Sequence, residues 1–124
     1  EERIRLQGEG KLLRIFIGES DKADHHALFS MIVKSAKERG LAGATVLRGV
    51  EGFGANSRSI HTARILRLSE DLPILIEIVD TEDKIQAFLP IVDALLERSG
   101  CGAMVTLEKV QVLHYGPSET SRGM

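Results

Sequence analysis

The chain lacks tryptophan, has a single cysteine, Cys101, and draws only 4% of its 124 residues from the aromatic types. A single thiol cannot form an intramolecular disulfide and suits a reducing compartment, so we expect a cytoplasmic protein. Because aromatic residues are scarce, the core has to be built from leucine, isoleucine and valine. No apolar run approaches the roughly 20 residues of a membrane helix. The charged start of the chain, residues 1–10, does not resemble a signal peptide.

The chain also lacks a strong charge of either sign. Its net charge of −2 creates no field that would attract nucleic acid, so no nucleic-acid partner is expected. With 43% apolar and 27% charged residues, the composition is that of one globular domain with a modest core. We assign this domain to residues 11–116. It lies between a charged N-terminal extension, residues 1–10, and a tail expected to be disordered, residues 117–124.

Four short apolar runs have the length and the β-branched content of strands. They lie at residues 12–17, 44–50, 73–79 and 104–115. In the last run the alternation of apolar residues changes phase near Glu108 and Lys109, which predicts a β-bulge there.

Two further segments repeat their apolar residues at helical spacing. The first helix is expected to be capped by Ser20 or Asp21, which places the pair His25-His26 near its start. The second helix is expected to follow Asp80 or Thr81. The run Gly100-Cys101-Gly102 ends it, since glycine is common just after a helix.

The resulting order is strand, helix, strand, long loop, strand, helix, strand. Two such units interleave into an α+β, ferredoxin-like βαββαβ fold with a four-stranded antiparallel sheet and both helices on one face. The other face of the sheet carries apolar residues too, including Leu75 and Val79. We therefore expect a homo-oligomer that covers this second face.

The long loop, residues 51–72, is the candidate functional segment, because compact domains rarely keep a loop of about twenty residues without a role. It opens with Gly52-Phe53-Gly54 and carries Arg58, His61, Arg64 and Arg67. The arginines could hold a phosphate or carboxylate in bidentate fashion, or they could be solvated or form inter-subunit salt bridges. His61 could be a pH-sensitive contact, or it could simply be exposed.

Outside this loop the chemistry-bearing residues are scattered. His114, near the end of the last strand, is either a cleft residue or an outward-facing one. Cys101 follows a helix C-terminus, whose dipole raises a thiol pKa, so a structural role is favoured. Glu77 and Glu108 lie on separate strands, and nothing in the sequence makes them converge. No nucleophile–base pair or metal motif is present, so neither an enzyme nor a metal site is expected.

The stretch Gly43-Ala44-Thr45-Val46, followed by Gly49-Val50-Glu51-Gly52-Phe53-Gly54, resembles the strand and loop base of the nitrogen-regulatory PII signalling proteins. The resemblance is closer to the PII-like family catalogued as domain of unknown function 190. It covers nearly the whole ordered chain, including Asp71-Leu72-Pro73-Ile74. It implies a homotrimer of ferredoxin-like subunits. Such a protein binds a small effector, commonly a nucleotide, in clefts between subunits, and touches a target protein with the mobile loop.

The chain departs from the PII pattern at two places. Ala55 and Asn56 stand where PII proteins have an arginine and then a glutamine that helps to hold magnesium with ATP. The phosphate-binding loop after the second helix is shortened to residues 100–103 and keeps glycines without the acid and the lysine. The resemblance thus implies a PII-like protein with a different ligand or none.

The main hypothesis is a trimeric PII-like regulatory protein that binds a nucleotide or another small anion near residues 52–54 and 100–102 and contacts a partner, such as a membrane transporter, through its loop. The alternative is a trimeric interaction module with no effector. An enzyme that uses His61 or His114 as a general base ranks last, because no second catalytic group accompanies either histidine.

Overall fold

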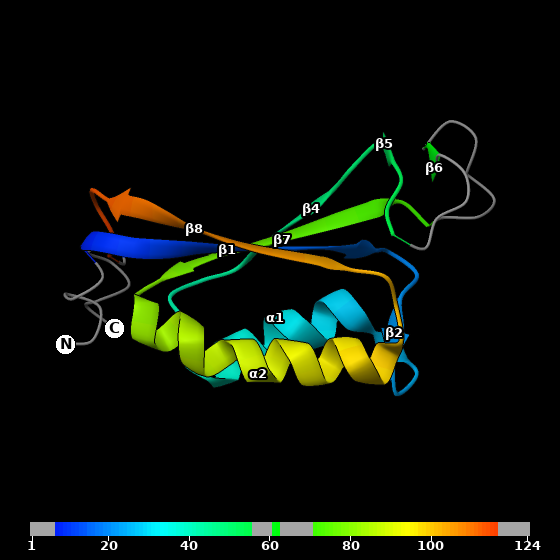
Figure 1. The fold of residues 1–124 in the computed structure, drawn as a ribbon, viewed down its shortest axis with the longest axis horizontal. Helices are drawn as coiled ribbons and strands as arrows, with labels where there is room; N and C mark the ends of the chain where they lie inside the picture. The colour runs from blue at the N-terminus through cyan, green and yellow to red at the C-terminus, as the bar shows by residue number, and fades with distance from the viewer. Residues whose placement is uncertain (1–6, 56–60, 63–70, 117–124) are drawn as a thin grey trace.

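The computed structural model of the chain describes residues 7–55, 61–62 and 71–116. One four-stranded antiparallel sheet forms the body of this part of the chain, with its strands in the order β4-β7-β1-β8. Both helices lie against the same face of the sheet (Figure 1). The expected ferredoxin-like βαββαβ arrangement is confirmed. Its elements are β1 (Gly8–Gly18), α1 (Leu28–Glu38), β4 (Thr45–Arg48), β7 (Pro73–Asp80), α2 (Glu82–Ser99) and β8 (Met104–Val112).

The core lies between the sheet and the two helices and is almost entirely aliphatic. Alternate residues of the central strands point into it, since successive side chains of a strand face opposite sides. Ile74, Ile76 and Ile78 of β7 are buried, as are Leu13 and Ile15 of β1. The helices contribute the buried residues Leu28, Ile32, Ala36, Ile85, Phe88, Val92 and Leu95. This single apolar layer fixes which face of the sheet the helices cover.

The start of α1 differs from the sequence prediction. The helix begins at Leu28, and its N-cap residue, Ala27, makes no side-chain capping bond. The preceding residues form a two-stranded hairpin of β2 (Lys22–Ala23) and β3 (His26–Ala27). Asp24 and His25 turn this hairpin with positive φ angles of 52° and 70°. The prediction of a helix around the two histidines was wrong, because the Asp21 carboxylate bonds to the Gly18 N–H instead of to a helix end.

Helix α2 begins and ends as predicted. The Thr81 hydroxyl accepts a hydrogen bond from the Lys84 N–H, which caps the helix at its start. Gly100 takes the left-handed conformation just past the last turn, with φ of 70°. A residue with a side chain is strained in that conformation, so Gly100 has a structural reason to be glycine. No helix in the described parts of the chain is long and apolar enough to cross a membrane.

The edge strand β8 pairs with β1 without interruption, from Phe16 opposite Met104 to Gly8 opposite Val112. The predicted β-bulge was therefore wrong. Strand β8 lies at the edge of the sheet, and its residues 104–109 are exposed on both sides. The positions of its apolar residues therefore do not indicate a single buried face, and the change in their alternation does not require a bulge. Strand β1 begins at Gly8, so the last three residues of the predicted extension belong to the sheet. The predicted disordered tail, residues 117–124, lies outside the described residues.

Candidate functional site

The two glycine segments singled out from the sequence lie at the same end of the sheet. Gly52–Gly54 follows β4, whose last residue, Arg48, pairs with Ile74 at the start of β7. Gly100–Gly102 leads into β8, whose first residue pairs with Phe16 near the end of β1. Strands β4 and β8 are the two opposite edges of the sheet. Three strand spacings of about 4.8 Å put these edges about 14 Å apart. A single chain therefore presents the two glycine segments at the same end but on opposite edges of the sheet.

The loop opens with a short hairpin. Strand β5 (Glu51–Gly52) pairs with β6 (His61–Thr62), and Gly52 lies opposite His61. The structure thus brings two predicted site residues together through their backbones. Phe53 follows with 74% of its surface exposed, and a Cβ added to Gly54 would meet no atom of the described residues within 4 Å. The loop base therefore offers open, partly apolar backbone that a ligand or a protein can approach. Arg58, Arg64 and Arg67 lie outside the described residues.

Two other candidate residues stand apart from this loop base. His114 follows β8 at the far end of the sheet, separated from Gly102 by the length of that strand, about 27 Å. Within a single chain His114 does not join the glycine segments. Cys101 is half-buried, and burial raises the pKa of its thiol. A protonated thiol is a poor nucleophile, which supports the structural role expected for this residue.

The helix-free face of the sheet carries an apolar surface. Leu12 and Phe16 of β1 lie on it beside Leu75 and Val79 of β7, because residues directly opposite in antiparallel strands point to the same side. Leu47 and Met104 extend it to both edges and are 48% and 60% exposed. Exposed apolar surface of this continuity is typical of a face that another protein surface covers.

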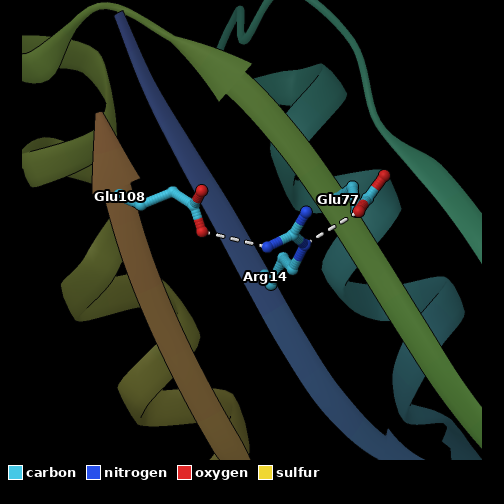
Figure 2. A network of polar contacts seen from close by, with 3 residues as sticks. All are labelled: Arg14, Glu77 and Glu108. Atoms are coloured by element: carbon cyan, nitrogen blue, oxygen red, sulfur yellow. Dashed lines mark hydrogen bonds and ion pairs between the residues drawn. The ribbon is translucent and has the colours of Figure 1, made fainter. Parts of the chain in front are cut away.

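An ionic network lies in the middle of this apolar face. The Arg14 Nε donates to Glu77 Oε2 at 2.9 Å, and its Nη1 donates to Glu108 Oε1 at 3.0 Å. Figure 2 shows the guanidinium between the two carboxylates, tying β7 and β8 to β1. The hydrogen bond to Glu77 is the main reason that the pKa of Arg14 is raised. Sequence reasoning missed this convergence. The sequence does contain a signal for it: Arg14 interrupts the apolar run of β1, and Glu77 interrupts that of β7.

A second polar cluster lies beside the loop, at the turn after β1. The Asp21 carboxylate accepts a hydrogen bond from the Gly18 N–H at 2.7 Å. The Asp71 carboxylate, from the returning end of the loop, accepts one from the Ser20 N–H at 3.1 Å. Burial raises the pKa of Asp21, and the negative charge of Asp71 raises it further, against the lowering effect of the Gly18 hydrogen bond. Among the described residues, neither Asp21 nor Asp71 forms a salt bridge, because the one arginine at this turn, Arg48, pairs with Glu19 instead.

We expect Asp21→Asn to keep the fold and to raise its stability slightly near neutral pH. An acid whose pKa is raised by folding costs stability once it ionises, so the penalty is absent at acid pH and grows as the pH rises through the raised value. Asparagine still accepts the Gly18 hydrogen bond and carries no charge. Urea unfolding of the parent and variant at acid and neutral pH measures the difference, with the exposed Asp93→Asn as control. A variant less stable than the parent at neutral pH would contradict this account.

A cavity of about 530 Å³ lies elsewhere, between the end of α1 and the start of α2. Its lining includes Arg39, Leu41, Lys84 and Phe88. It is at the opposite end of the sheet from the glycine segments, since β7 runs from the loop at Pro73 to this end at Asp80. The cavity therefore contributes nothing to the glycine site. Among the described residues, no group of three or more histidine, cysteine or acidic side chains is arranged to hold a metal ion.

Comparison with known sequences identifies the family. Residues 10–112 match the family described as "Uncharacterized ACR, COG1993", DUF190. A UPF0166 protein of Aquifex aeolicus (strain VF5) is 36% identical over 104 residues, which cover 84% of this chain and 93% of that protein. The UPF0166 protein MJ1524 of Methanocaldococcus jannaschii is 36% identical over 92 residues, which cover 74% of this chain and 83% of that protein.

Comparison with solved structures identifies the fold. The structure of CPII, a nitrogen regulatory PII-like protein from Thiomonas intermedia K12 bound to ADP, AMP and bicarbonate, matches with a TM-score of 0.64. The two chains are 18% identical, and the match covers 86% of this chain and 90% of CPII. At this identity the likeness concerns the arrangement of the backbone and not the ligand. The chain belongs to the DUF190 family and has the fold of the PII-like proteins.

Proposed function

We propose that this chain is a PII-like regulatory protein that binds a small anionic effector of the nucleotide class between subunits of a homotrimer and contacts a target protein through residues 51–72. The observation that carries the proposal is the placement of the two glycine segments. They lie at the same end of the sheet but beside opposite edge strands, and three strand spacings put these edges about 14 Å apart. In the proposed trimer the β4 edge of one chain lies next to the β8 edge of its neighbour, so the two glycine segments line the same cleft between subunits.

The helix-free face supports the oligomer that this site requires. Its apolar residues on β1, β7 and both edge strands remain open to solvent in a single chain. Packing three copies through this face buries that surface, and a closed ring satisfies all three interfaces equally. The clefts then lie where the sheet edges of adjacent copies meet.

The class of ligand is supported by the fold likeness and by the open backbone at Gly54. CPII binds ADP, AMP and bicarbonate. Glycine allows close approach of a ligand to the backbone, and a Cβ added to Gly54 has no neighbour within 4 Å in the part of the chain that the structure describes. The chain lacks the PII residues for magnesium–ATP, so ADP, AMP and bicarbonate are the first ligands to test.

We expect Gly54→Val to weaken ADP binding at least ten-fold and to leave the melting temperature of the ligand-free protein unchanged. The valine side chain occupies the open space that a ligand would enter. Gly43→Val is a matched control, since an added Cβ there also meets no atom among the described residues within 4 Å, and the residue precedes β4 at its other end. Thermal shift and calorimetric titration with ADP, AMP and bicarbonate measure both effects. Equal binding by the two variants would remove Gly54 from the site.

The alternative function, an interaction module without an effector, has one observation in its favour. Val50 and Phe53 at the loop base are 75% and 74% exposed, and exposed apolar side chains suit a protein partner. If no nucleotide or anion raises the melting temperature of the parent protein, this alternative is favoured. Recovery of the same partner, for instance a membrane transporter, with and without added ADP would support it.

A further inference from the structure

The turn at residues 18–21 contacts both ends of the long loop. At the departing end, the Arg48 Nη2 lies 2.8 Å from Glu19 Oε2. At the returning end, the Glu19 N–H donates to the Leu72 carbonyl at 2.8 Å, and the Ser20 N–H donates to Asp71 Oδ1 at 3.1 Å. Three contacts from two consecutive residues thus join the points where the chain leaves the sheet after β4 and re-enters it at β7.

The turn is shaped to receive the Asp71 carboxylate. Its own backbone is closed by the Asp21 N–H, which donates to the Gly18 carbonyl, and by the Asp21 carboxylate, which accepts from the Gly18 N–H. A Cβ at Gly18 would lie 2.6 Å from Asp71 Oδ1, which is closer than real Cβ atoms come to any neighbour. Glycine at this position therefore leaves the room that the Asp71 side chain uses.

The same turn contains two unfavourable features that limit its strength. Asp71 brings a second negative charge next to the partly buried Asp21. The other carboxylate oxygen of Glu19, Oε1, is buried and has no hydrogen-bond partner in the described part of the chain. A purely structural tie would be expected to satisfy these groups, since buried unpaired polar atoms destabilise a fold. The hydrogen bonds of the turn thus have good geometry. The charge of Asp71 and the buried Glu19 Oε1, however, are not offset by partner groups among the described residues.

We propose that residues 18–21 form a clasp that holds the two ends of the 51–72 segment as one cooperative unit, so that loss of the Asp71 contact also loosens the contacts of Glu19 with the chain on either side of the segment. This deepens the proposed function and rests on it for its biological meaning, since the segment is the proposed contact with the target. Gly52–Gly54 lies only a few residues beyond Arg48, so the proposed ligand site is next to the departing end of the clasp.

Amide hydrogen exchange of the ligand-free protein tests the clasp. We expect Asp71→Ala to speed exchange at the Ser20 amide at least ten-fold, because its acceptor is gone. If the clasp acts as a unit, exchange at the Glu19 amide also rises several-fold, although its acceptor, the Leu72 carbonyl, is still present. Asp71→Asn keeps an acceptor without the charge and is expected to restore slow exchange at both amides. The exposed Asp93→Ala serves as the control.

A second substitution disturbs the same Asp71 contact from the other side, so the test does not depend on a single variant. Gly18→Ala is expected to displace the Asp71 carboxylate and to speed exchange at Ser20, because the end of that side chain can move more easily than the backbone. Unchanged exchange at Ser20 and Glu19 in both Asp71→Ala and Gly18→Ala would overturn the clasp. Faster exchange confined to Ser20 would also overturn it, since Asp71 would then be a local bond only. Absence of ADP binding in the parent protein would instead count against the proposed function and leave these exchange rates as they are.

Discussion

Replacing Phe16 by glutamate is expected to convert the proposed trimer into monomers and to abolish the proposed nucleotide binding together with it. Phe16 lies on the helix-free face, where it is 39% exposed in a single chain and pairs across the sheet with Leu75 and Met104. Covering a carboxylate at that position with an apolar surface of another copy costs far more than leaving it in water. In the monomer the same glutamate is solvated, so the subunit keeps its fold.

Light scattering after gel filtration measures the mass of the assembly, and thermal shift with ADP reports the site. Ala94→Glu, on the exposed side of α2, makes a similar change of charge on the helix layer and is expected to leave both readouts as in the parent. If Phe16→Glu stays trimeric, the helix-free face is not the subunit interface. If it is monomeric and still binds ADP with the parent's affinity, the site does not need two subunits.

The arrangement of strands and helices was predictable from the sequence because the signals are local and repeated. The isoleucines of β7 alternate with partly exposed residues, and the buried apolar residues of α2 recur at helical spacing. These two patterns indicate both the type of each element and the face that it buries. The strand β8 has no such signal. As an edge strand exposed on both sides it keeps apolar residues without a single buried face, and the predicted bulge was wrong for that reason.

The contacts between distant charged residues could not be predicted in the same way. Arg14 meets Glu77 and Glu108 across 63 and 94 positions of the chain, and only the register of three antiparallel strands brings them together. The start of α1 was misplaced for a related reason. Asp21 has the chemistry of a helix cap, but the tight turn with Gly18 uses its carboxylate first. The type of a polar residue limits which groups it can bond to, but the tertiary structure determines which of those groups lies close enough.

Replacing Asp80 by alanine is expected to destabilise the subunit by about 3 kcal/mol or more, because two backbone donors lose a charged acceptor, each worth about 1.5–3 kcal/mol. Asp80 is only 5% exposed. Its Oδ2 accepts a hydrogen bond from the Ala42 N–H at 2.8 Å, and its Oδ1 accepts one from the Thr81 N–H at 2.6 Å. The carboxylate thus joins the segment before β4, the end of β7 and the start of α2.

Urea unfolding at equal protein concentration measures this loss, with Asp93→Ala as the exposed control, expected within about 0.5 kcal/mol of the parent. Asp80→Asn separates the two bonds. Its amide has one accepting oxygen and one donating nitrogen, so only one of the two backbone N–H groups keeps a partner and an intermediate loss is expected. If Asp80→Ala unfolds within 1 kcal/mol of the parent, water must replace the carboxylate at both donors. The junction would then depend on the apolar core and not on this side chain.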